Sequence, residues 1–312
     1  MRFTIPSVKL CQMPSGKFAR EGLVMDGLSR FERSCMLIKA SWRALCADGE
    51  LIVLPVLSGI ASLVVIAAFG AMTTVAAAFG HFDHLNKSSD LPGWFYAGLF
   101  VFYIVQYFII IYFNTALVGA AIERLEGGNP SIRSALSLAD QRFGAIFGYA
   151  FISATIGLLL RMIAERLGII GRVIESGVGL AWTVTTFLVV PVLAAEGCGP
   201  LQAIERSASL LKKTWGENII GSAGISLALS LLSAFIVVIG VVGGFRLQAN
   251  GSEALAISVF AVTAVLFTAI VVVSTALSAI YAAAVYQYAV GRRAPRWFDG
   301  GLIESSFTRK SK

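Results

Sequence analysis

Apolar residues fall into six long runs that are separated by shorter polar segments. The runs cover residues 51–79, 93–122, 143–160, 173–194, 218–243 and 255–290. Because a helix needs roughly 20 apolar residues to cross the hydrocarbon core of a bilayer, this pattern predicts six transmembrane helices. Several runs are longer than one crossing requires, so we expect those helices to tilt or to project into water.

Three charged segments that resemble one another each precede a pair of these runs. Residues 32–42 (ERSCMLIKASW) and 205–215 (ERSASLLKKTW) share six of eleven residues, and residues 130–144 form a weaker copy. On a helix, each segment gathers apolar residues on one stripe with polar or basic residues beside it. The stripes contain Leu28, Phe31, Cys35, Ile38, Trp42 and Leu45 in the first copy, Ile132, Leu136, Ala139 and Phe143 in the second, and Leu201, Ile204, Ala208, Leu211 and Trp215 in the third.

The repeated segments predict the architecture of the whole chain. We expect an all-α polytopic membrane protein of three pseudo-repeats at about 27–122, 129–195 and 199–291. Each repeat would be an interfacial amphipathic helix followed by a helical hairpin. Residues 1–26 would form a polar, flexible extension, of which 1–24 are dispensable, and 292–312 a basic tail.

Basic and aromatic residues in the repeated segments are candidates for lipid contact. Basic flanks suit anionic headgroups, and tryptophan anchors a helix at the membrane interface. The candidate headgroup contacts are Arg33, Lys39, Trp42, Arg206, Lys212, Lys213 and Trp215. Docking of these helices onto protein instead of lipid explains the stripes equally well.

Lysine and arginine are distributed unevenly between the two predicted sides of the membrane. The N-terminal segment, the two loops on the same side and the C-terminal tail hold eight, three, three and six of them, and the opposite side holds five. This asymmetry places both termini in the cytoplasm. The net charge of +7 then matches anionic lipid, and no nucleic-acid partner is expected.

Few polar residues lie within the apolar runs. Gln106 and Asn114, in the second run, are the candidates for an intramembrane polar site, because polar groups at bilayer depth are costly. Pro55 and Pro191 are candidate hinges, since proline removes a helical hydrogen bond. Glu196 would either cap the helix that starts near residue 200 or contact an ion or headgroup.

Familiar catalytic and metal-binding motifs are missing from the sequence. It has no phosphate-binding glycine loop, no nucleophile elbow, no paired Cys-x-x-Cys and no HExxH. His81, Asp83 and His84 could contact a divalent metal, but their spacing matches no established site, and a solvated loop is favoured. We expect no enzyme activity and no cofactor.

Two segments resemble a known family. Residues 112–132 (YFNTALVGAAIERLEGGNPSI) and 186–221, with Pro191, Glu196, Gly199, Pro200, Ser207, Trp215 and Gly216, are similar to an uncharacterised prokaryotic six-span family, a domain of unknown function. More distantly, they resemble the membrane domain fused to some glycerophosphodiester phosphodiesterases. The resemblance covers about residues 28–290 and implies a cytoplasmic-membrane protein. The phosphodiesterase activity does not transfer, because this chain has no soluble catalytic domain.

Two functions are consistent with these features. The first is a non-catalytic protein that organises or senses the inner leaflet, or docks a membrane-protein partner or a second copy of itself. The alternative is a transporter or channel for a small solute or lipid, with a site near Gln106, Asn114 and the two prolines. A polar cavity that reaches Asn114 would favour the alternative.

Overall fold

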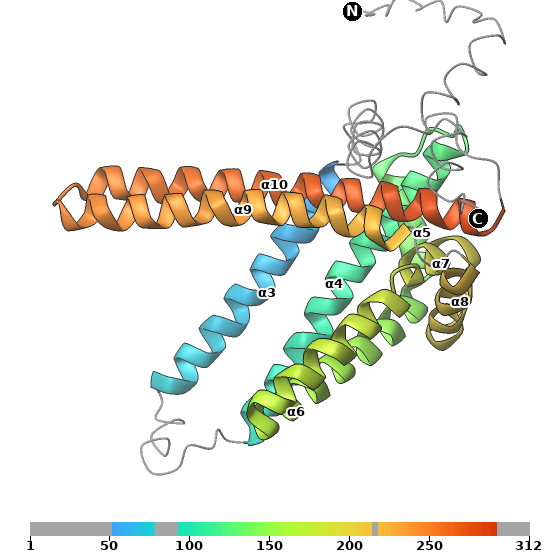
Figure 1. Cartoon of the computed structure of the whole chain (residues 1–312), viewed down its shortest axis with the longest axis horizontal. Helices are drawn as coiled ribbons and strands as arrows, with labels where there is room; N and C mark the ends of the chain where they lie inside the picture. Colours follow the sequence, from blue (N-terminus) through green and yellow to red (C-terminus); the bar gives the residue numbers. More distant parts are fainter. Residues whose placement is uncertain (1–51, 79–92, 214–217, 292–312) are drawn as a thin grey trace, which may run out of the picture.

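The computed structural model describes residues 52–78, 93–213 and 218–291, which form helices joined by short turns (Figure 1). The helices are α3 (Val53–Ala78), α4 (Gly93–Leu125), α5 (Ile132–Gln141), α6 (Phe143–Thr185), α7 (Val189–Glu196), α8 (Pro200–Lys213), α9 (Asn218–Ala249) and α10 (Glu253–Ala289). The predicted all-α class is confirmed for this part of the chain.

Several sequence predictions lie outside the described residues. These are the two terminal segments 1–26 and 292–312, the first predicted surface helix with Arg33, Lys39 and Trp42, the metal candidates His81, Asp83 and His84, and Trp215.

Five of the described helices are long and apolar enough to cross a membrane: Val53–Ala76, Trp94–Leu125, Phe143–Glu196, Ser230–Ala249 and Glu253–Ala289. Large apolar side chains remain exposed along them, and Leu63, Phe235 and Val265 are 65%, 63% and 69% exposed. Continuous apolar surface of this extent needs a lipid environment. The chain is therefore a multi-pass membrane protein.

Helix α6 differs from the sequence prediction, which expected two runs, 143–160 and 173–194, joined by an outer loop. The chain is instead helical from Phe143 to Thr185, with one non-helical residue at Gly168 (φ 58°, ψ −125°). Charged residues end an apolar run, but they do not end a helix, because Arg and Glu are good helix formers. The predicted loop is therefore helical on both sides of Gly168.

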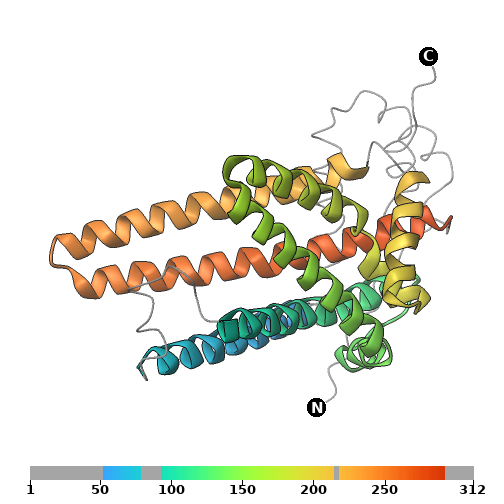
Figure 2. The same ribbon diagram turned by 90° about the horizontal axis from the view of Figure 1, so that it is seen from below.

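The chain reverses direction at Gly168. Gly171 packs against the backbone of Ile163 and Ala164, which a straight helix would hold more than 10 Å away at 1.5 Å per residue. Beyond the turn the second arm runs back toward the junction. Pro200, at the start of α8, contacts Gly148 near the start of the first arm. Figure 2 shows the two arms of α6 diverging from this turn.

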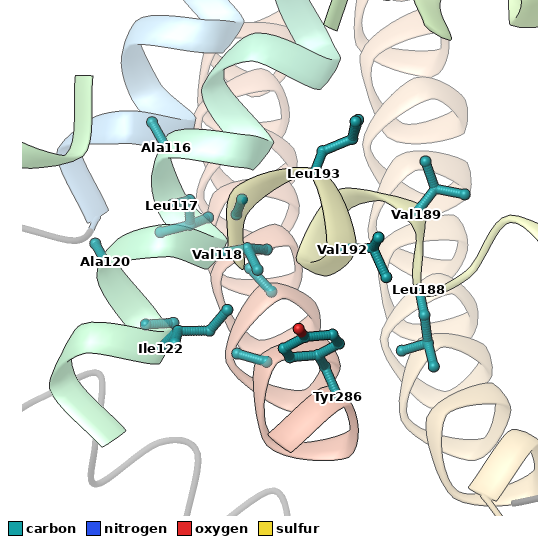
Figure 3. Packing of buried hydrophobic residues seen from close by; sticks show 14 of the residues in the cluster. Ala116, Leu117, Val118, Ala120, Ile122, Leu188, Val189, Val192, Leu193 and Tyr286 are labelled. Atoms are coloured by element: carbon teal, nitrogen blue, oxygen red, sulfur yellow. The ribbon is translucent and has the colours of Figure 1, made fainter. Parts of the chain in front are cut away.

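The main core lies at one end of the molecule, which we call the junction. Here the C-terminal parts of α4 and α10, the start of α6, and α7 pack together with Leu54 of α3. Figure 3 shows side chains of this core from three helices, among them Leu117 and Val118 of α4, Val192 and Leu193 of α7, and Tyr286 of α10. These helix ends are the ones that the sequence assigned to a single side of the membrane.

The short helices α5 and α8 lie at the junction. Helix α5 begins at an N-cap, Ser131, whose side chain accepts a hydrogen bond from the Ser134 backbone, and it buries Ala135 and Ala139. Helix α8 buries Ala203, Ser207 and Leu210. Both helices therefore pack onto protein along one face.

Helix α9 packs along α10, and this pair diverges from α3, α4 and α6 away from the junction (Figure 1). Apart from Ala256, the buried residues of α10 lie between Ala276 and Gln287. The pair is therefore joined to the rest of the described structure mainly through the C-terminal third of α10.

Candidate functional site

Glu196, the last residue of α7, connects three helices at the junction. Its Oε1 atom accepts hydrogen bonds from Arg206 Nε of α8 and from Tyr286 Oη of α10, both at 3.1 Å. The Glu196 and Arg206 side chains are 29% and 42% exposed, so solvent weakens this ion pair. The contact fixes the relative position of α7, α8 and α10 more than it adds stability.

Glu196 was also a candidate cap for α8. The backbone N–H of Gly199, just before α8, donates instead to Gln202 Oε1 at 3.3 Å. The carboxylate of Glu196 is occupied by Arg206 and Tyr286, and no cap from Glu196 to α8 is present among the described hydrogen bonds.

Arg142 occupies the corner between α5 and α6. Its guanidinium lies directly over Gly197, the residue that ends α7 in a left-handed conformation. A positive charge at this place is favourable because the C-terminal carbonyls of a helix carry a partial negative charge. Arg142 therefore holds the α5–α6 corner against the α7–α8 corner.

The importance of Arg142 was not apparent from the sequence. Arg142 stands 55 residues before Gly197, and no sequence pattern links the two residues. A weak signal was available: an arginine between two predicted helices can reach the free carbonyls at the end of a third helix.

Ser207 is fully buried and joins α8 to the break between α6 and α7. Its hydroxyl donates to the Thr185 carbonyl at 2.7 Å and accepts from the Leu188 backbone N–H at 3.1 Å. The break precedes Pro191, whose ring clashes with the carbonyl four residues earlier and whose nitrogen cannot donate. Ser207 thus satisfies backbone groups that this interruption would leave unpaired.

Two further contacts attach α4 to its neighbours at the junction. Tyr112 Oη donates to Asp140 Oδ1 of α5 at 2.6 Å. Gln287 of α10, which is 2% exposed, donates from Nε2 to the Ile122 carbonyl at 3.4 Å. Side chains from α4, α5, α7, α8 and α10 therefore form one polar layer around the apolar core of the junction.

Cys198 lies between α7 and α8, close to Glu196, Arg142 and Arg206. Burial raises the pKa of the Cys198 thiol, and the Glu196 carboxylate raises it further, against the opposing effects of its own backbone and of the two arginines. A raised pKa keeps the thiol protonated at neutral pH, and a protonated thiol is a poor nucleophile.

The remaining predicted residues are spread along the structure. Gln106 and Asn114 are both partly buried on α4, and Gln106 Oε1 has no hydrogen-bond partner among the described residues. Pro55 and Pro191 are buried in the first turns of α3 and α7, where proline is tolerated. Hinge motion at either proline stays a prediction.

The headgroup candidates on α8 have different environments. Arg206 pairs with Glu196, whereas Lys212 is exposed. The side chain of Lys213 lies outside the described part of the structure. Among the described residues, no group of three or more His, Cys, Asp or Glu side chains could hold a metal ion.

The fold and the junction define a class: a multi-pass helical membrane protein whose transmembrane helices meet, with two short helices, in one polar-rimmed core. Residues 94–295 match a family of unknown function, DUF6159, and the chain belongs to this family. The expected membership of an uncharacterised family is thus confirmed, although the match begins at α4 and not near residue 28. Similarity to glycerophosphodiester phosphodiesterases is not shown, and no protein of curated function matches the chain.

Proposed function

We propose that this chain is a non-catalytic protein of a prokaryotic cytoplasmic membrane, with both termini in the cytoplasm, that holds anionic lipid at the inner surface through α8. The observation that carries the proposal is that α8 has two different apolar faces. One face, with Ala203, Ser207 and Leu210, is buried on the protein. The other is left for lipid.

The second face of α8 is only part of the stripe that the sequence singled out, because Leu211 of that stripe is buried, at 3% exposed. Leu201 is 70% exposed, and Ile204 and Ala208 are only partly buried. At 100° per residue these three side chains lie between the protein-facing side and the polar side that carries Lys212. One side of α8 therefore packs on protein, the adjacent side is apolar, and the side after that carries a lysine. A helix with these three sides is suited to lie among the lipid headgroups, with its apolar side toward the acyl chains.

The turn at Gly168 supports six crossings of the bilayer. As a straight helix, the 43 residues of α6 would extend about 65 Å, roughly twice the hydrocarbon thickness. Two antiparallel arms divide this length into two crossings. All helix ends at the junction then lie on the inner side, where α5 and α8 continue the three-repeat arrangement.

The depth of α8 can be measured with a fluorescent thiol label. The four natural cysteines would be replaced, and single cysteines placed at Leu201 or at Ser209, which lies on the polar side. We expect lipids with brominated acyl chains to quench a label at position 201 more strongly than one at 209, because the 201 side chain faces the acyl-chain boundary. Equal quenching, or the reverse order, would contradict this orientation.

Lipid retention tests the role of the basic residues. Changing Arg206, Lys212 and Lys213 to Gln should reduce the fraction of protein that keeps bound phosphatidylglycerol in native mass spectrometry, because each basic residue near the surface contributes about 1 kcal/mol. The matched control changes Arg166, Arg172 and Arg246, which lie away from the junction, to Gln. Retention that responds equally to both triple variants would remove the reason for assigning α8 to headgroups.

A further inference from the structure

A ridge of polar and small residues runs along the first arm of α6. Tyr149, Ser153, Gly157, Arg161 and Glu165 recur at every fourth position. Residues spaced by four form a continuous ridge on a helix, and such ridges pack into the grooves of a neighbouring helix. This ridge is notable because the rest of the arm is almost entirely apolar.

The ridge faces two tyrosines of α4. Arg161 Nη1 donates to Tyr103 Oη at 2.9 Å, and Arg161 also pairs with Glu165 at 3.0 Å, as their spacing of four permits. One turn further along, a Cβ atom placed on Gly157 would lie 3.5 Å from Tyr107 Oη. From the first contact to the second, the residue number rises on α4, from 103 to 107, and falls on α6, from 161 to 157. The two helices are therefore antiparallel, and their polar ridges meet.

The row of polar side chains continues from this ridge to the junction through the second arm of α6. The Tyr149 phenol lies beside both Ser153 and Thr186. Thr186 follows Thr185, whose carbonyl accepts the hydrogen bond from Ser207 of α8. We call the set Tyr103, Tyr107, Tyr149, Ser153, Arg161 and Thr186 the α4–α6 seam.

One buried polar atom of the seam, Ser153 Oγ, has no partner in the described chain. Ser153 is 5% exposed, and its Oγ makes no hydrogen bond of good geometry even though Tyr149 is adjacent. Most buried polar groups in folded proteins bond to protein or to ordered water, and an unpaired group in hydrocarbon is costly.

We propose that the α4–α6 seam is a hydrated binding path, and that its ligands are water and small uncharged molecules that both donate and accept hydrogen bonds. Tyrosine and serine hydroxyls can both donate and accept hydrogen bonds. The formal charges of the ridge, on Arg161 and Glu165, pair with each other at the far end. The middle of the seam therefore suits a neutral ligand better than an ion.

Gly157 lies where the α6 ridge meets Tyr107. An alanine methyl group there would make only an ordinary contact with Tyr107, whereas a leucine side chain would extend into the line along which the two ridges meet. Tyr107 itself is 36% exposed, so the seam is open on one flank at this level. This path does not depend on the depth of α8, and its failure would leave the proposed role of α8 intact.

Hydroxyl-radical footprinting of the unmodified full-length protein in lipid nanodiscs tests for water in the seam. Radicals generated by X-rays from bound water oxidise the side chains that this water touches. Tyr149 and Tyr281 are matched controls, because they are 7% and 5% exposed and only Tyr149 belongs to the seam. We expect Tyr149 to be oxidised several-fold faster. Equal oxidation of the two tyrosines would overturn the proposal.

Cysteine reactivity provides the second test. In protein without natural cysteines, Ser153→Cys should react with a small water-soluble methanethiosulfonate reagent, because the reactive thiolate forms only where water reaches it. Ala154→Cys, at a neighbouring position that is 1% exposed, should react many-fold more slowly. Adding Gly157→Leu should slow the reaction at 153, while Gly157→Ala should not. Equal rates at 153 and 154, or no effect of Gly157→Leu, would count against a hydrated seam.

Discussion

Replacing Gly240 with isoleucine is expected to separate α9 from α10 and to lower the thermal stability of the protein in lipid. A Cβ atom at position 240 would overlap Thr263 of α10, including its own Cβ, which cannot move without moving the helix. Helices in lipid associate through close packing of small residues, and overpacking typically costs about 1–3 kcal/mol. The unfolding temperature in nanodiscs should therefore fall.

A matched control lies three residues away on the same helix. No atom lies within 4 Å of a Cβ atom placed on Gly243, so Gly243→Ile should leave the unfolding temperature unchanged or raise it slightly. Because α10 is the principal neighbour of α9, the effect of Gly240→Ile should appear as a greater distance between labels on the two helices. A similar response of both variants would show that packing at Gly240 does not hold the pair together.

The second large effect is expected for Gly197→Ala at the junction. Gly197 has φ 63°, a left-handed conformation that costs a residue with a Cβ atom about 1–2 kcal/mol. The new methyl group would also overlap the Arg142 guanidinium and add about 1–3 kcal/mol of overpacking. The protein should unfold at a clearly lower temperature, because the α5–α6 and α7–α8 corners would be forced apart.

Two companion variants separate these causes. Gly144→Ala, in open space near the start of α6, should be neutral or stabilising by up to about 1 kcal/mol, because alanine favours a helix. Combining Gly197→Ala with Arg142→Ala should recover the overpacking part of the loss but not the backbone part, as a double-mutant cycle would reveal. Additive losses would mean that Arg142 and Gly197 do not interact.

The long helices were predictable because one physical variable determines them. The apolar runs 93–122 and 255–290 correspond to α4 (Gly93–Leu125) and α10 (Glu253–Ala289) within a few residues. A helix in lipid must be apolar around its whole surface, so its extent can be read from composition along the chain.

The buried face of α8 was predicted only in part. The sequence selected an apolar stripe of Leu201, Ile204, Ala208, Leu211 and Trp215. Leu211 is buried, but the rest of the protein-facing side is formed by Ala203, Ser207 and Leu210, and Leu201 is exposed. Periodicity identifies the most hydrophobic side of a helix, but close packing against protein favours small side chains and hydrogen bonds. Ser207, which the periodicity treats as polar, is fully buried because it bonds the backbone at the α6–α7 break.

By itself, the sequence determined that this chain is helical, membrane-embedded and built from long apolar segments with short charged helices between them. Only the tertiary structure decided that α6 reverses at Gly168, that Arg142 lies over Gly197, and that polar ridges of α4 and α6 face each other. Hydrophobicity is a property of each segment and depends only on the residues within it. The contacts depend on which segments meet, and in lipid that choice is made by shape and hydrogen bonding between residues far apart in sequence.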